Sequence, residues 1–171
     1  MTDRLHVYLL LDTSASMHGA PLEAMRHGLQ SLIGTLIARS KRPVQVAILG
    51  YESSPRQLMP LSDINDFGAF PLPKLEAMGS SGLGKAIRLA LATLPEYRPA
   101  LMYIFTDGEP TDDWKSALAL AHERLDKIYG LLCGLIADPE ATEIAAEVDE
   151  IHRLGDMTPD KAFDTFRAFS G

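Results

Sequence analysis

The 171-residue chain has 46% hydrophobic and 23% charged residues, proportions that are ordinary for a soluble globular protein. This length predicts one domain, residues 1–171, with a core large enough to fold without disulfides or a structural metal. The formal net charge of -7 and the lack of a Lys/Arg cluster argue against a nucleic acid or an anionic membrane as partner. They favour a neutral or basic protein.

The only cysteine is Cys133, so the chain has no internal disulfide and no cysteine-based zinc site. It lies in the apolar run 128–136, where we expect a buried, inert thiol. The N-terminal segment MTDRLHVYLLLD lacks the longer apolar stretch and the cleavage site of a signal peptide. We therefore expect a cytoplasmic protein without a membrane partner.

The first half of the chain contains three predicted strands and one amphipathic helix. A continuous apolar run begins at Leu5 and stops at Asp12, as expected for a strand buried on both faces of a parallel sheet. Apolar residues of 21–39 recur on one side of a helix that starts with a proline. Strands are expected over 44–51 and 57–61, and the short link between them predicts an antiparallel hairpin.

The second half continues the alternation after an irregular, proline-bearing segment over 62–78. Helices are expected from Leu83 to Pro95, from Asp112 to Lys127, from Asp138 to Val148 and over 159–169, and strands over 100–105, 128–136 and 150–154. Strands that alternate with helices predict an α/β fold in three layers, with a mostly parallel sheet flanked by helices.

The first predicted strand ends in a set of oxygen-bearing side chains. Asp12, Ser14 and Ser16 stand at alternate positions, and alternate side chains of an extended segment point the same way. Their hard oxygen donors suit Mg²⁺ better than Zn²⁺ or copper. The same residues are also favoured in turns and helix caps, so this segment alone does not decide between a cation site and a polar loop.

The strand over 100–105 also ends at a carboxylate, that of Asp107. In open α/β sheets ligands bind beyond the carboxyl ends of the strands, where the strand order reverses. If the two strands are neighbours, Asp12 and Asp107 lie side by side and repel each other unless a cation lies between them. The Ser81 hydroxyl, in the Gly-rich loop before a helix, would complete most of an octahedron with Ser14 and Ser16.

Three segments, DTSASMHGAP, GSSGLG and TDGEPTD, resemble the metal-ion-dependent adhesion site (MIDAS) of von Willebrand factor type A domains, in the usual order. The run TDGEPTDDW is similar to small stand-alone bacterial members associated with tellurite-resistance operons. The resemblance covers essentially the whole chain. It implies a Rossmann-like sheet of six strands in the order 3-2-1-4-5-6, with strand 3 antiparallel, and a divalent cation on its upper edge.

The same resemblance assigns the metal ligands. Asp12, Ser14, Ser16 and Asp107 match the family's ligands, and Ser81 stands where the family usually has threonine. The cation is usually Mg²⁺, with Mn²⁺ or Ca²⁺ as alternatives. Family members commonly bind a partner's Glu or Asp as the last ligand, and most have no catalytic activity.

Several neighbouring residues are candidates for lesser roles. His18 either lies on a partner-binding rim or is an ordinary exposed histidine, and Glu109 is a candidate for the same rim. Asp112 and Asp113 either reach the site through water or cap a helix. Tyr51, with Glu52 after it, ends a strand near the same edge and is also predicted to line the rim.

Two classes of function follow from these residues. The first is a non-enzymatic module whose cation captures a Glu or Asp of a protein partner, in a tellurite-resistance or stress-response system. The second is a Mg²⁺-dependent hydrolase or phosphotransfer enzyme that uses the same aspartates. A haloacid-dehalogenase-type phosphatase would need Asp where Ser14 stands, and no GxSxG, P-loop or HExxH pattern occurs. The sequence therefore favours the interaction module.

Overall fold

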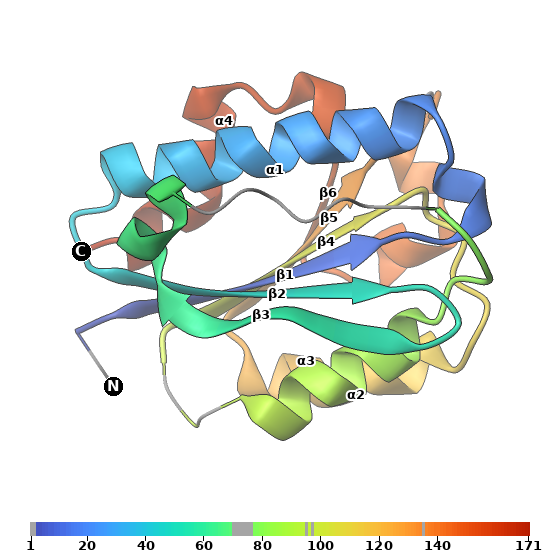
Figure 1. The fold of residues 1–171 in the computed structure, drawn as a ribbon, viewed down its shortest axis with the longest axis horizontal. Coiled ribbons are helices and arrows are strands. Elements are labelled where there is room, and N and C mark those ends of the chain that lie inside the picture. The colour runs from blue at the N-terminus through green and yellow to red at the C-terminus, as the bar shows by residue number, and fades with distance from the viewer. Residues whose placement is uncertain (1–2, 70–76, 95, 97, 135) are drawn as a thin grey trace.

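The apolar run that ends at Asp12 forms the strand β1 (Leu5–Asp12), in which every residue is buried. It lies inside a six-stranded sheet in a computed structural model that describes residues 3–69, 77–94, 96, 98–134 and 136–171 (Figure 1). The other strands are β2 (Val44–Tyr51), β3 (Pro55–Asp63), β4 (Ala100–Thr106), β5 (Lys127–Leu132) and β6 (Glu150–Arg153). The α-helices are α1 (Ala20–Arg39), α2 (Leu83–Thr93), α3 (Trp114–Arg124) and α4 (Pro159–Phe166).

The sheet has the order β3-β2-β1-β4-β5-β6, which confirms the predicted order. All neighbouring strands are parallel except β2 and β3, which form the predicted antiparallel hairpin. The hairpin is longer than expected and has register shifts between Val46 and Leu49. From β1 the chain adds β2 and β3 toward one edge of the sheet, and from β4 it adds β5 and β6 toward the other. The strand order therefore reverses between β1 and β4, at whose carboxyl ends ligands bind in sheets of this kind.

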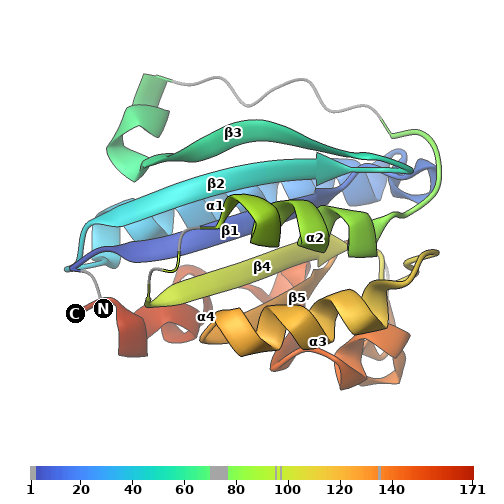
Figure 2. The ribbon, with the colours of Figure 1, turned by 90° about the horizontal axis from the view of Figure 1, so that it is seen from below.

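Helices cover both faces of the sheet, and each face has its own core. Figures 1 and 2 show α1 and α4 on one face and α2 and α3 on the other. The alternate residues Leu9 and Leu11 of β1 pack in the core under α1, whereas Tyr8 and Leu10 pack in the core under α2 and α3. Asp12 continues this second set by alternation, so its side chain lies on the α2 side at the edge of the sheet.

The segment predicted as a helix from Asp138 to Val148 is instead two 3-10 helices, Pro139–Ala141 and Glu143–Ala146. Thr142 lies between them with extended backbone, φ -75° and ψ 149°, so no continuous helix forms. The i to i+3 bonds on both sides close separate single turns.

The run predicted as a strand over 128–136 leaves the sheet early. The strand β5 ends at Leu132, and Gly134, with a φ of 92°, turns the chain away. The last predicted helix also differs, because α4 ends at Phe166 and a 3-10 helix over Arg167–Phe169 follows. In the described part of the chain no helix is both long and apolar enough to span a membrane.

Candidate metal centre

The three segments that carry the predicted ligands meet at the carboxyl edge of the sheet. Leu11 pairs with Phe105 across β1 and β4, so Asp12 and Thr106 are neighbours one residue further on. The Ala15 N–H donates to the Gly79 carbonyl at 2.8 Å, which joins the first loop to the Gly-rich loop. The strand register therefore brings together the distant segments that carry Asp12 and Asp107, as the sequence predicts.

The Asp12 carboxylate lies at the back of this edge and is fully buried. Its Oδ1 accepts the Ser14 N–H at 2.9 Å, and its Oδ2 accepts the hydroxyls of Thr106 at 2.7 Å and Ser81 at 3.2 Å. Burial raises the pKa of the Asp12 carboxyl, hydrogen bonds from Ser14 and Thr106 oppose the rise, and the charge of Asp107 adds to it. The two carboxylates are thus close enough to interact.

Asp107 faces the same point from the end of β4. Its Oδ2 accepts a hydrogen bond from the Ser16 hydroxyl, and its Oδ1 accepts the Glu109 N–H at 3.1 Å. The Ser16 Oγ lies 3.3 Å from the Ser14 Oγ. A chain of contacts therefore runs from Asp12 through the Ser14 N–H and the hydroxyls of Ser14 and Ser16 to Asp107.

The residues at this edge fit a divalent cation. Within the described ranges, no Lys, Arg or His side chain forms an ion pair with Asp12 or Asp107. A buried carboxylate without a cationic partner is costly, and a dication between the two would remove that cost. No group of three His, Cys, Asp or Glu suited to a metal occurs among those residues, so hydroxyls must supply the remaining protein ligands. Two carboxylates and three hydroxyls form an all-oxygen set that suits Mg²⁺.

A cleft of about 760 Å³ opens beside these oxygens. Its wall contains Ser14, Ser16, Ser81, Asp107 and Glu109, so five residues singled out from the sequence share one surface. Its lining also includes Ala141, Thr142 and Glu143, from the two 3-10 helices after β5. The charged side chains among the described lining residues are all acidic.

The predicted rim residues are placed differently from one another. Glu109 is exposed and lines the cleft, whereas His18 is exposed on the turn after Ser16 and is not among the described lining residues. The prediction that Tyr51 lines the rim is wrong, because its side chain is fully buried between β2 and α2. Glu52 is half-buried, and its carbonyl accepts the Gly82 N–H at 2.7 Å.

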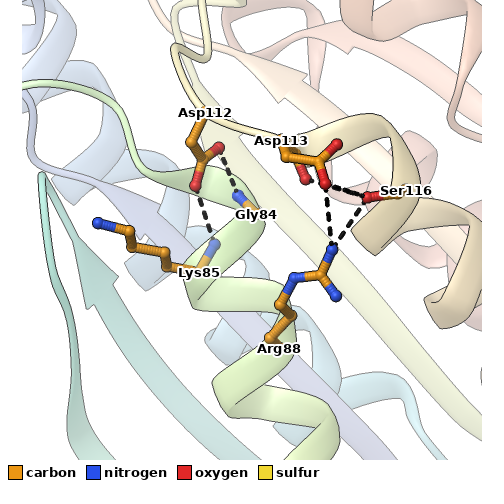
Figure 3. Close-up of polar contacts among 6 residues, drawn as sticks. All are labelled: Gly84, Lys85, Arg88, Asp112, Asp113 and Ser116. Atoms are coloured by element: carbon orange, nitrogen blue, oxygen red, sulfur yellow. Dashed lines mark hydrogen bonds and ion pairs between the residues drawn. The ribbon is translucent and has the colours of Figure 1, made fainter.

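Asp112 caps a helix, but the helix is α2 and not the one that follows it. Its two carboxylate oxygens accept the N–H groups of Gly84 at 2.9 Å and Lys85 at 3.0 Å (Figure 3). A Cβ on Gly84 would lie 2.7 Å from the Asp113 carbonyl, so only glycine allows this close approach. The loop after β4 and the start of α2 are therefore held together.

Asp113 stands at the N-cap of α3 without capping it by a hydrogen bond to a backbone N–H. Its carboxylate accepts the Ser116 hydroxyl at 2.6 Å and faces Arg88 at 3.5 Å (Figure 3). These contacts give both aspartates structural roles at the start of helices.

Two threonines that the sequence analysis did not single out position the predicted ligands. Thr106 donates to Asp12, and Thr111 bonds to Ser81 through both backbone and hydroxyl groups. The role of Thr106 could have been recognised from the sequence, since this residue precedes Asp107 at the end of a buried strand. Thr111 carries no such signal, because its partner is 30 residues away along the chain.

The structure is a Rossmann-like α/β sheet with oxygen-bearing side chains clustered at the carboxyl ends of its central strands. The family model described as von Willebrand factor type A domain matches residues 7–109, and this chain belongs to that family. No protein with a curated description matches the sequence.

Solved structures with the same fold come from varied sources. An aerotolerance-related membrane protein from Bacteroides fragilis is 19% identical with a TM-score of 0.69, covering 96% of this chain and 97% of its own. A von Willebrand factor type A protein from Catenulispora acidiphila is 18% identical with a TM-score of 0.66, covering 98% and 42%. The proximal thread matrix protein 1 of the mussel byssus, with zinc in its MIDAS motif, is 14% identical with a TM-score of 0.67, covering 95% and 46%.

At these identities the likeness shows the fold alone. This chain spans less than half the length of the Catenulispora and mussel chains, and nearly all of the Bacteroides chain.

Proposed function

We propose that this chain is a metal-dependent protein-interaction module. Asp12, Ser14, Ser16, Ser81 and Asp107 hold one divalent cation, and a Glu or Asp of a protein partner supplies a further ligand. The observation that carries the proposal is the convergence of Asp12 and Asp107 from distant segments, linked through the Ser14 N–H and the hydroxyls of Ser14 and Ser16, without a cationic side chain beside them among the described residues. A cation bound there would leave a coordination position facing the cleft for the partner.

Magnesium is the proposed ion, because all the protein ligands are hard oxygen donors. Mn²⁺ and Ca²⁺ are the alternatives with similar ligand preference. Zinc belongs in the same test, since the mussel relative holds zinc in its MIDAS motif.

The charge of the cleft supports an ion as the link to an acidic partner. Without an ion, the described charged lining residues are Asp107, Glu109 and Glu143, and they would repel a carboxylate. A bound dication reverses this locally, while Glu109 and Glu143 still favour neutral or basic residues around the partner's acid. This agrees with the net charge of -7.

Exposed residues around the loops would add contact area. Met78 is 52% exposed, and its N–H donates to the Thr13 carbonyl at 2.9 Å, next to the segment with the predicted ligands. Methionine is enriched in protein interfaces and adapts to varied apolar surfaces. We propose Met78 and His18 as contact residues on this side of the site and Glu109 on the other.

We also propose that the chain is not an enzyme. The described lining residues of the cleft include serines and carboxylates but no His, Cys or Lys side chain, so no imidazole or amine among them is available to activate a serine as a nucleophile. The segment TDGEPTDDW supports a place beside the tellurite-resistance-associated bacterial members, in a cytoplasmic stress-response system.

Thermal unfolding in EDTA and in millimolar Mg²⁺, Mn²⁺, Ca²⁺ or Zn²⁺ tests the cation site. An ion that binds only the folded state stabilises it by about 2.7 kcal/mol at a hundredfold excess over Kd. We expect this gain in the wild type and in the exposed-residue control Asp113→Ala, and its loss in Asp107→Ala. A wild type that no ion stabilises would overturn the proposal.

Two further measurements distinguish a protein-interaction module from an enzyme. Proteins retained on the immobilised chain in Mg²⁺ should elute with EDTA and should not bind the Asp107→Ala variant. A retained partner should also lose binding when one Glu or Asp of its own is substituted. Turnover of phosphoesters by the wild type, absent from Asp107→Ala, would establish the enzyme instead.

A further inference from the structure

Three side chains from adjacent strands form a row on the α2 side of the sheet. Tyr51 on β2 pairs in register with Asp12 on β1, and Thr106 on β4 lies beside Asp12 on its other side. Parallel strands in register present neighbouring side chains on the same face. Asp12 is therefore flanked by a phenol on one side and a hydroxyl on the other.

The Tyr51 hydroxyl is a buried polar group without a hydrogen bond. Its side chain is fully buried, and the hydroxyl has no partner within the described part of the chain. Burial raises the pKa of Tyr51 well above its ordinary value, and the charge of Asp12 raises it further, while the Thr106 hydroxyl opposes the rise. The group is thus a protonated donor that faces the Asp12–Thr106 pair.

An unpaired buried donor beside a buried carboxylate is unusual. Buried polar groups nearly always have partners, and an exception needs an explanation. Two adjacent partners are already in place, since the Thr106 hydroxyl and the Asp12 carboxylate bond to each other at 2.7 Å. A small movement of this pair would give the Tyr51 hydroxyl an acceptor.

We propose that Tyr51 is a positioning residue of the cation site, whose hydroxyl bonds to the Asp12–Thr106 pair when a cation is bound. This rests on the proposed cation site. A ligand shifts an equilibrium only through interactions that differ between the two states. The hydrogen bond that the Tyr51 hydroxyl donates around the bound ion supplies such a difference and adds to the affinity for the ion.

Tyr8 provides a matched control on the same face of the sheet. Its hydroxyl is also buried and without a hydrogen-bond partner among the described residues, and its ring packs in the same core as Tyr51. It lies four residues before Asp12 on β1, about 13 Å away at the rise of an extended strand. Tyr8→Phe therefore removes an equivalent hydroxyl far from the proposed ion.

The test combines cation affinity with stability in EDTA. Titration calorimetry of the wild type, Tyr51→Phe and Tyr8→Phe with Mg²⁺ should give a Kd raised about tenfold for Tyr51→Phe, the scale of lost outer partners of metal ligands. It should be unchanged within about twofold for Tyr8→Phe. Urea unfolding in EDTA should give midpoints at or above the wild type for both variants, since each loses an unsatisfied buried group.

The outcomes separate this inference from the cation site itself. A wild type that binds no cation overturns both proposals. A wild type that binds Mg²⁺, with Tyr51→Phe equal to it in Kd, overturns the role of Tyr51 alone, and so does a lower urea midpoint of Tyr51→Phe in EDTA. The double variant Tyr51→Phe and Thr106→Val should raise the Kd for Mg²⁺ by less than the product of the two single fold-changes, because both residues act through one hydrogen-bonded group.

Discussion

Thr111 holds Ser81 at both ends of its backbone. The Ser81 N–H donates to the Thr111 hydroxyl at 3.1 Å, and the Thr111 N–H donates to the Ser81 carbonyl at 2.8 Å. Since the Ser81 hydroxyl in turn donates to Asp12, the loop after β4 determines where this predicted ligand lies. The three ligand-bearing loops are therefore one hydrogen-bonded unit, and a change in one is expected to affect the others.

Asp12→Asn is expected to stabilise the metal-free protein near neutral pH and to abolish stabilisation by Mg²⁺. Burial first, and the charge of Asp107 as well, raise the pKa of Asp12 above its ordinary 3.8. A carboxyl whose pKa is higher in the folded than in the unfolded protein stabilises the fold when it is protonated, below its pKa in the unfolded chain. This stabilisation is lost as the pH rises through its pKa in the folded protein. The advantage of the Asn variant should therefore grow as the pH rises from about 4.

Urea unfolding in EDTA across that pH range measures this difference. Asp113→Asn, at an exposed aspartate outside the cleft, is the control and should follow the wild type at every pH. An advantage of Asp12→Asn that stays constant with pH would contradict the assignment of the raised pKa to this residue.

Ser81→Ala is expected to weaken Mg²⁺ binding by about tenfold or more, the scale seen when groups around a metal are removed. It should also lower the metal-free stability by about 1 kcal/mol, because the Asp12 carboxylate loses one of its hydroxyl donors. Ser80→Ala is the matched control, since Ser80 is exposed and bonds to Ser53 at 3.2 Å instead. Calorimetry and urea unfolding that gave equal effects for both variants would contradict the role of Ser81.

Asp112→Ala is expected to lower the free energy of unfolding by about 1 kcal/mol, the usual cost of a lost helix cap. The two N–H groups of Gly84 and Lys85 at the start of α2 would lose their acceptor. Asp113→Ala should cost less than about 0.5 kcal/mol, because its contact with Arg88 is exposed. Equal urea midpoints for the two variants would show that Asp112 does not act as the cap.

Cys133 is expected to be inert in the folded protein. The thiol is buried, and burial raises its pKa to about 12, with the charges of Asp12 and Asp107 adding to the rise. The reactive thiolate is therefore scarce and shielded at pH 8. A colorimetric disulfide reagent should find no thiol in the native chain and one in urea, and rapid native reaction would contradict the buried placement.

Most element types could be predicted from the sequence, because they depend on local patterns, whereas the strand order came from the resemblance to von Willebrand factor type A domains. Continuous apolar runs such as 5–11 mark doubly buried strands, and the short link after Tyr51 leaves room only for a hairpin. The segment 138–148 was mispredicted because an extended Thr142 divides it, a backbone choice that side-chain periodicity does not report.

The five predicted ligands could be named from the sequence, since their spacing and chemistry, together with the resemblance to von Willebrand factor type A domains, carry that signal. Only the tertiary structure decided which groups hold them, because those partners come from other strands and loops. Thr106 and Thr111 reach the site through strand register and loop packing, and Asp112 caps a helix that precedes it in the chain. Local sequence determines which ligand groups each segment carries, whereas contacts between distant segments determine which of these groups lie close enough to bond.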